Sequence, residues 1–202
     1  MRARVKYVVV LGPDGSGKTT IADELVSALA EKYSVRNISF TFGIMPSISH
    51  LLGREPRRSL PEGQRDSGMV KPIRRSHAAI LAIWYGMDHL LGHWVLFRAK
   101  PGGVVVSARS YHDFLYQRAY LHLPEAIPRL FLALGPKPDL AIALWRDPDV
   151  IHTQKPELTS EEIAAQYARI TVRLKRYGYF ESMDASSGIS TTVDRIYRRL
   201  GL

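Results

Sequence analysis

Residues 11–20 read LGPDGSGKTT, and this stretch is the most specific indication of the fold in the chain. It satisfies the pattern G-x-x-x-x-G-K-[ST] with Gly12, Gly17, Lys18 and Thr19. The apolar run YVVV precedes the pattern and predicts a buried strand, and a helical pattern follows it. In that context the glycines let successive N–H groups turn toward one point, and the helix N-terminus adds a positive dipole end. The stretch therefore predicts a loop that binds a nucleoside triphosphate.

Individual side chains of this loop have separate expected roles. Lys18 is expected to reach the β- and γ-phosphates of ATP, and the Thr19 hydroxyl to ligate Mg²⁺. Asp14 is an anion in a cradle built for anions, so we expect it to point across the loop toward a second substrate. The alternative is a turn residue that stabilises the loop backbone. The expected nucleotide-binding residues are Gly12, Asp14, Gly15, Ser16, Gly17, Lys18, Thr19 and Thr20.

Length and composition fit one soluble α/β domain over residues 1–202, with 46% hydrophobic and 23% charged residues. The absence of cysteine excludes a disulfide framework, a thiolate nucleophile and a zinc–thiolate site. A formal net charge of +9 favours anionic partners, although a basic surface without a partner would have the same charge. The basic start of the chain runs into the glycine loop within a few residues, so we interpret it as the first strand and expect a cytoplasmic protein.

Strand and helix patterns alternate along the chain, which predicts a parallel sheet covered on both faces. The expected strands are residues 5–12, 34–42, 101–107, 138–145 and 179–186. The expected long helices are residues 18–33, 76–98, 160–178 and 189–200. Thr159 and Glu162 have the spacing of a capping box at the start of the third of these helices.

Within the helix expected at 76–98, residues 78–97 resemble a membrane span, but Asp88, His89 and His93 favour a buried helix in a soluble protein. Its large apolar residues alternate spacings of three and four and predict one core face. Tyr85 and Asp88 lie together on another face, with His89 and Gly92. The predicted core face consists of Ile80, Ile83, Met87, Leu90, Trp94 and Phe97.

Two further segments suggest substrate handling. Residues 43–75 form a long, proline-interrupted stretch with seven basic and three acidic residues, and we interpret it as a mobile substrate-side loop or a solvated tether. Residues 153–160 form a short lid that contains Lys155.

The stretch GPDGSGKTT resembles the phosphate loop of thymidylate kinases and their relatives. Residues 104–114, VVVSARSYHDF, resemble a strand ending that reads Asp-Arg-Tyr in that family and is followed by a Tyr-Gln pair, here Tyr116 and Gln117. Residues 138–162 resemble the fourth strand and the lid, and the short KPEL lid is most similar to thymidylate-kinase-like proteins of bacterial polysaccharide assembly. Residues 183–190 resemble the loop that holds adenine. The resemblance implies a three-layer P-loop NTPase fold with five parallel strands in the order 2-3-1-4-5.

The same resemblance implies roles outside the loop. Arg109 would clamp the acceptor's phosphate or the transferring γ-phosphoryl group, unless it forms a surface ion pair. Lys155 would supply positive charge from the lid. Tyr85 and Asp88 would line an acceptor pocket with Tyr111, although Asp88 could instead pair with a buried basic residue. His112 and Asp113 could position the acceptor or cap the following helix.

The chain departs from the family at three strand-end positions. Ala108 replaces the aspartate of Asp-Arg-Tyr and Ser110 replaces its tyrosine, while Trp145 stands where an acidic residue is often placed. Carboxylates at such positions support Mg²⁺ or the acceptor hydroxyl. The departures therefore predict a weak or specialised kinase, or a domain that binds ATP without turnover.

The function that we expect is ATP- and Mg²⁺-dependent phosphoryl transfer to a small acceptor, dTMP or a related nucleoside or nucleotide. A sugar or glycan kinase is the alternative that the lid and the basic loop favour. An ATP-binding regulatory or nucleic-acid-associated module is the alternative that Ala108 and the charge of +9 favour, although nucleic acid is not the favoured partner. The oligomeric state stays open, with a homodimer among the alternatives.

Overall fold

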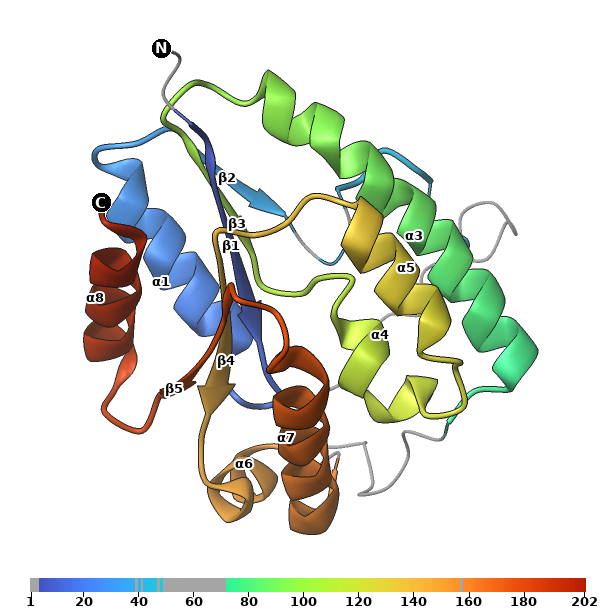
Figure 1. The fold of residues 1–202 in the computed structure, drawn as a ribbon. Helices are drawn as coiled ribbons and strands as arrows, with labels where there is room; N and C mark the ends of the chain where they lie inside the picture. Colours follow the sequence, from blue (N-terminus) through green and yellow to red (C-terminus); the bar gives the residue numbers. More distant parts are fainter. Residues whose placement is uncertain (1–3, 39, 41, 47, 49–71, 157) are drawn as a thin grey trace.

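Five parallel strands form a single sheet in the order β2-β3-β1-β4-β5, as the resemblance implied (Figure 1). This computed structural model describes residues 4–38, 40, 42–46, 48, 72–156 and 158–202. The strands are β1 (Lys6–Leu11), β2 (Val35–Ile38), β3 (Val104–Ser107), β4 (Leu140–Trp145) and β5 (Phe180–Asp184). Each expected strand is present. β2 ends four residues early, because the chain turns at Phe40, whose φ is 64°.

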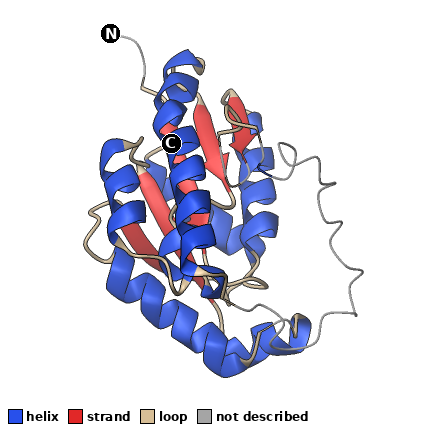
Figure 2. Ribbon diagram, turned by 90° about the vertical axis from the view of Figure 1, so that its right-hand side faces the viewer, coloured by secondary structure: helices blue, strands red, loops and turns tan. Residues whose placement is uncertain are grey.

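Helices cover both faces of the sheet and complete a three-layer α/β fold (Figures 1 and 2). One face packs against α1 (Lys18–Ala30) and α8 (Ile189–Leu200). The other face packs against α3 (Arg75–Arg98), α4 (Asp113–Tyr116), α5 (Ala126–Leu134) and α7 (Ser160–Leu174). The helix α6 (Pro148–Gln154) contacts α7, and a short 3₁₀ helix, η1, spans Arg118–Tyr120.

The central strand β1 explains why two helical layers are needed. Val8 and Val10 point into the layer beside α1 and α8, whereas Val9 and Leu11 point into the layer on the opposite face. All four side chains have no exposed surface, because successive side chains of a strand alternate between its faces. The continuous apolar run thus requires cover on both sides.

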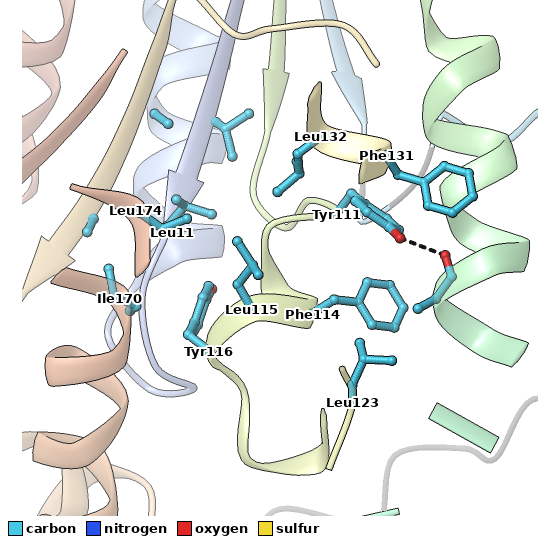
Figure 3. Close-up of a cluster of buried hydrophobic side chains, with 14 of the residues drawn as sticks. Leu11, Tyr111, Phe114, Leu115, Tyr116, Leu123, Phe131, Leu132, Ile170 and Leu174 are labelled. Atoms are coloured by element: carbon cyan, nitrogen blue, oxygen red, sulfur yellow. Dashed lines mark hydrogen bonds between the residues drawn. The ribbon is translucent and has the colours of Figure 1, made fainter. Parts of the chain in front are cut away.

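Aromatic rings fill the layer between the sheet and α3 (Figure 3). The Tyr111 ring lies 5.0 Å from that of Phe114 and 5.9 Å from that of Phe131, between ring centroids. The Tyr111 hydroxyl donates a 2.7 Å hydrogen bond to the carbonyl oxygen of Ala82 on α3. This layer fixes α3 against the segment that follows β3.

The core face predicted for α3 is wrong. Five of its six residues are exposed and Leu90 is half-buried. The buried face instead carries small residues, which let neighbouring rings approach the helix axis. At Gly86, for example, a Cβ atom would lie 2.5 Å from the ring of Phe131. The exposed fractions of the five are 60% for Ile80, 48% for Ile83, 45% for Met87, 61% for Trp94 and 75% for Phe97.

Other expectations for the helices have mixed outcomes. Thr159 caps α7, since its hydroxyl accepts a 3.3 Å hydrogen bond from the N–H of Glu162, which confirms one half of the predicted capping box. The Glu162 carboxylate, which the box would place on Thr159, pairs with Arg118 and Arg169. None of the described helices has the length and apolar character to cross a membrane. The predicted basic loop at 43–75 lies for the most part outside the described residues.

Candidate functional site

The loop between β1 and α1 has the backbone of an anion cradle. Gly12, Gly15 and Gly17 have φ angles of 147°, 90° and 90°, in the left-handed region that glycine tolerates best. A Cβ atom at Gly12 would lie 2.5 Å from the Ser16 hydroxyl oxygen, so this position also lacks room for a side chain. α1 begins at Lys18, directly after Gly17. The loop therefore presents N–H groups and the helix N-terminus in one place.

Two polar side chains are buried inside this loop. The Lys18 ammonium donates to the carbonyl oxygens of Gly12 and Pro13 at 2.8 and 2.7 Å. Burial lowers the pKa of Lys18. The buried Ser16 hydroxyl has no hydrogen-bond partner within the part of the chain that the structure describes. An unpaired buried donor of this kind is a feature that a bound phosphate oxygen would satisfy.

Asp14 brings together the three cations that the sequence singled out as catalytic. Its Oδ1 atom lies 2.9 Å from Nη2 of Arg109 and 3.3 Å from Nζ of Lys18. Burial alone would raise the pKa of Asp14, but the charges of Lys18 and Arg109, with a smaller effect of Lys155, hold that pKa below its usual range. A Cβ atom at Gly15 would lie 3.3 Å from Cβ of Lys155, which places the lid against the loop. The second substrate that Asp14 was expected to face stays a prediction.

Hydrogen bonds to the main-chain carbonyl oxygen of Arg109 fix the backbone that carries its side chain. Its carbonyl oxygen accepts a 3.1 Å hydrogen bond from the N–H of Phe40 and another hydrogen bond from the Ser107 hydroxyl. These bonds join the ends of β2 and β3 at the carboxyl edge of the sheet. Open α/β sheets bind ligands at this edge. The guanidinium, which is partly exposed, can thus face both the cradle and a ligand beside it.

Asp113 is the site residue that sequence reasoning undervalued. Its carboxylate is fully buried and accepts hydrogen bonds from the Tyr116 hydroxyl at 2.6 Å and the Gln117 amide at 2.8 Å. Burial raises the pKa of Asp113 to about 6, against the opposing charges of Lys18 and Arg109. The Tyr116 hydroxyl also lies 3.4 Å from the N–H nitrogen of Gly12. Asp113 is therefore linked through Tyr116 to the cradle, a contact that its position one turn before Tyr116 could have suggested.

His112 occupies the N-cap position of α4, but its side chain makes no capping hydrogen bond to that helix. Its ring is fully buried, with Nδ1 2.9 Å from the Ser110 hydroxyl and Nε2 3.1 Å from the Tyr179 hydroxyl. Burial lowers the pKa of His112 to about 3, so the ring is neutral at physiological pH. His112 therefore ties the segment after β3 to the segment before β5.

Two residues expected in an acceptor pocket turn into the interior of the fold. The Asp88 carboxylate is fully buried and accepts hydrogen bonds from the N–H groups of Phe42, Ile44 and Met45 at 2.6, 2.7 and 2.7 Å. These partners are backbone amides, and no basic side chain of the described residues pairs with the Asp88 carboxylate. Tyr111 is also buried, with its hydroxyl on α3. Asp88 and Tyr111 thus shape the region behind the site.

Tyr85, the third residue expected in the acceptor pocket, lies close to Arg109 through its contact with Phe40. It is half-buried, and its ring centroid lies 5.2 Å from that of Phe40, the residue hydrogen-bonded to Arg109. Phe40 also packs against Phe114, at 5.9 Å between centroids. The Phe114 ring is buried, so the apolar surface on this side of Arg109 consists of the partly exposed rings of Phe40 and Tyr85.

Trp145 flanks the cradle on the side opposite β3. It is partly exposed at the end of β4, with its ring 6.3 Å from that of Tyr167. The Tyr167 hydroxyl donates to the carbonyl oxygen of Leu144 at 3.0 Å and accepts from the N–H of Arg146 at 3.0 Å. The strand end that carries Trp145 is therefore fixed, and it supplies an aromatic surface at the position where the resemblance described above led us to expect a carboxylate.

The fit of Mg²⁺ rests on Thr19, which is exposed in the first turn of α1. Within the described ranges, no three histidine or carboxylate side chains form a group that could hold a metal ion alone. The two carboxylates beside the cradle, Asp14 and Asp113, are engaged by other side chains. These residues would fit a Mg²⁺ ion that is held jointly by the Thr19 hydroxyl and by phosphate oxygens of a bound nucleotide.

No protein-family model matches this chain, and no curated protein is significantly similar to it. The geometry of the cradle and of the cations around Asp14 therefore carries the functional argument.

Proposed function

We propose that this chain is an ATP-dependent phosphotransferase that moves the γ-phosphoryl group of ATP to a small acceptor. The observation that carries the proposal is the convergence of Lys18, Arg109 and Lys155 on Asp14, next to a cradle of backbone N–H groups. A phosphoryl group in transfer spreads negative charge over its equatorial oxygens and needs cations on several sides.

The proposed mechanism is positioning and electrostatic stabilisation. Lys18 exchanges its bonds to the carbonyls of Gly12 and Pro13 for phosphate oxygens. The Ser16 hydroxyl and the loop N–H groups bind the remaining oxygens. Arg109 donates two parallel N–H groups to the transferring phosphoryl group or to a phosphate of the acceptor. Mg²⁺, when bound through the Thr19 hydroxyl, supplies further positive charge to the phosphates.

The acceptor class that we favour is a nucleoside or nucleotide, such as dTMP. The partly exposed rings of Phe40 and Tyr85 beside Arg109 support this choice, because they place an apolar ring surface next to a phosphate-binding group. A sugar or glycan acceptor is the alternative that the short KPEL lid supports. Both acceptors would use the same cations.

A nucleotide-binding module without transfer activity is the second candidate function. This candidate is favoured by the hydrogen bonds and ion pairs that already occupy the two carboxylates beside the cradle. Asp14 is paired with two cations, and both oxygens of Asp113 accept hydrogen bonds. Neither carboxylate in this arrangement is placed to accept a proton from an acceptor hydroxyl.

The deciding experiment is transfer of label from γ-labelled ATP with Mg²⁺ to a panel of dTMP, other nucleoside monophosphates, nucleosides and sugars. We expect a labelled product that Lys18→Ala abolishes and that the same change at the exposed residue Lys32 leaves intact. No product across the panel, together with ATP binding that depends on Lys18, would replace the proposal by the binding module. Product formation that survives Lys18→Ala would overturn the mechanism.

A further inference from the structure

Asp113, Tyr116 and Gly12 form a chain of hydrogen bonds behind the cradle. The Tyr116 hydroxyl lies 2.6 Å from Oδ1 of Asp113, 3.4 Å from the main-chain nitrogen of Gly12 and 3.3 Å from the carbonyl oxygen of Gly12. That carbonyl oxygen also accepts a 2.8 Å hydrogen bond from the Lys18 ammonium. One hydroxyl group therefore lies between a buried carboxylate and the loop that is proposed to bind phosphate.

The protonation of Asp113 sets the direction of this chain, because a hydroxyl donates one hydrogen bond at a time. The 2.6 Å separation is typical of a hydroxyl that donates to an ionised carboxylate. Tyr116 then accepts from the N–H of Gly12, and the carbonyl oxygen of Gly12 is left to Lys18. Burial and the charge of Asp113 raise the pKa of Tyr116 well above its usual value, so this group remains a hydroxyl.

A protonated Asp113 would reverse the chain. The O–H group on Oδ1 would donate to the phenolic oxygen of Tyr116, and the Tyr116 hydroxyl would then donate to the carbonyl oxygen of Gly12. Gln117 could continue to donate to Oδ2 of Asp113, which lies 2.8 Å from its amide nitrogen. In this state the carbonyl oxygen of Gly12 has a donor without Lys18.

The charges around Asp113 would change in the same direction when phosphate binds. Burial raises the pKa of Asp113 to about 6, the charges of Lys18 and Arg109 limit this rise, and the charge of Asp14 adds to it. Tyr120 of η1 also faces the carboxylate. In the proposed mechanism, phosphates pair with both cations and bring negative charge of their own. Each of these changes disfavours the ionised form of Asp113.

The helix that carries Asp113 and Tyr116 is held in place from α7. Nε of Arg169 donates a 2.9 Å hydrogen bond to the carbonyl oxygen of Tyr116, and Arg173 donates to that of Leu115. Each of these arginines is also paired with a carboxylate, which is Glu162 for the first and Glu125 for the second. A change of charge next to the cradle therefore alters the hydrogen bonds of a helix that stays in position.

We infer that binding of phosphate in the cradle is coupled to uptake of one proton from solvent by Asp113, with Tyr116 as the connection. Lys18 leaves the carbonyl oxygen of Gly12 for the phosphates, and the Tyr116 hydroxyl donates to that oxygen instead. Asp113 is thus a positioning residue that acts on the loop through Tyr116. This coupling rests on the phosphate binding of the proposed function and does not depend on phosphoryl transfer.

The coupling gives phosphate affinity a pH dependence of defined sign. The phosphate-bound protein holds more protons than the free protein, in which the pKa of Asp113 is about 6, so the affinity falls as the pH rises above 6. Between pH 6.5 and 8, we expect the affinity for inorganic tripolyphosphate to fall at least about fivefold more in the wild type than in Asp113→Asn.

Isothermal titration calorimetry with tripolyphosphate counts the protons directly, at pH 7 in PIPES and in imidazole buffer, whose ionisation enthalpies differ. We expect the wild type to take up at least about 0.5 proton more per bound ligand than Asp113→Asn. Protonation of the ligand itself is common to both proteins and cancels in this difference. The matched control is Asp88→Asn, because Asp88 is equally buried but binds backbone amides. This control should retain the wild-type proton uptake.

Tyr116→Phe tests the connection between Asp113 and the loop. Loss of the hydroxyl removes a hydrogen bond from the ionised carboxylate and so raises the pKa of Asp113 in the free protein. More of the variant is then already protonated at pH 7, and we expect at most about half of the proton uptake that distinguishes the wild type from Asp113→Asn. Full wild-type uptake in Tyr116→Phe would overturn the role of Tyr116.

Infrared difference spectroscopy provides a measurement on the unaltered protein. We expect the carbonyl stretching band of a protonated carboxyl group to appear when tripolyphosphate binds at pH 7, and to be missing from Asp113→Asn. Binding of tripolyphosphate with neither this band nor a difference in proton uptake would overturn the coupling and leave the proposed function intact. A wild-type protein that does not bind tripolyphosphate would overturn both.

Discussion

Nη2 of Arg109 and Oδ1 of Asp14 lie 2.9 Å apart, although 95 residues separate them in the chain. The same carboxylate oxygen is 3.3 Å from Nζ of Lys18. The pair connects the glycine loop after β1 to the end of β3. The protein's own carboxylate thus engages the cations that, in the proposed function, neutralise the transferring phosphoryl group. The negative charge of Asp14 is therefore expected to weaken the binding of phosphate.

Asp14→Asn is expected to strengthen binding of inorganic tripolyphosphate at least about tenfold. The substitution removes a negative charge from the anion cradle, and charges a few ångströms apart near a protein surface interact by several kcal/mol. Isothermal titration calorimetry measures the affinity, and the gain should shrink as salt is added if it is electrostatic. Asp194→Asn, an exposed carboxylate in the middle of α8, is the control. Equal or weaker binding by Asp14→Asn would show that the carboxylate does not compete with phosphate.

Arg109→Ala is expected to lower the rate of acceptor phosphorylation about 1,000-fold while it changes the dissociation constant of ATP by less than about threefold. The first effect follows from loss of the guanidinium that faces the transferring group. Steady-state kinetics and ATP titrations measure the two quantities. Arg199→Ala is the control, because Arg199 pairs with Glu181 away from the loop. Equal losses in both quantities would assign Arg109 to the nucleotide instead of the acceptor.

Asp113→Asn is expected to change the pH dependence of stability. The pKa of Asp113 is about 6 in the folded protein, above the value near 4 of an unfolded chain. The folded state thus keeps this carboxyl protonated up to a higher pH than the unfolded chain does. The carboxyl therefore stabilises the fold fully below pH 4, and this contribution is lost as the pH rises through 6. Between pH 4 and 7 the free energy of unfolding should therefore fall by about 2 kcal/mol more in the wild type than in the variant. Urea unfolding measures this difference, and parallel pH curves would contradict the raised pKa.

Asp88→Asn is expected to destabilise the fold by about 1–3 kcal/mol and to leave tripolyphosphate affinity unchanged. An asparagine offers one acceptor oxygen, so at least one of the three N–H groups of residues 42, 44 and 45 faces an amide NH₂ group. Asp88→Ala leaves all three unpaired and should cost more. Urea unfolding and calorimetry measure the two properties. A stable Asp88→Asn variant with weakened acceptor binding would restore the acceptor-pocket role expected from the sequence.

The sequence alone determined the features that depend on neighbouring residues. The glycines at 12, 15 and 17 define a loop backbone, and the apolar run before them defines a strand buried on both faces. Thr159 and Glu162 define a helix start. These features follow from local sterics and hydrogen bonding, which spacing in the sequence reports directly. The strand order came from the family resemblance, and pairing across the sheet confirms it.

The tertiary structure was needed to see which faces of the helices are buried and which side chains contact one another. The periodicity of α3 defined two faces, but the face with the large side chains is exposed, because Phe131 and Phe42 pack against Gly86 and Gly92 on the other. Likewise, no local pattern indicates that Asp113 is buried next to Lys18, or that Asp88 binds three backbone amides. Burial, paired charge and the pKa shifts that result depend on atoms brought together from distant segments, and no local pattern contains those distances.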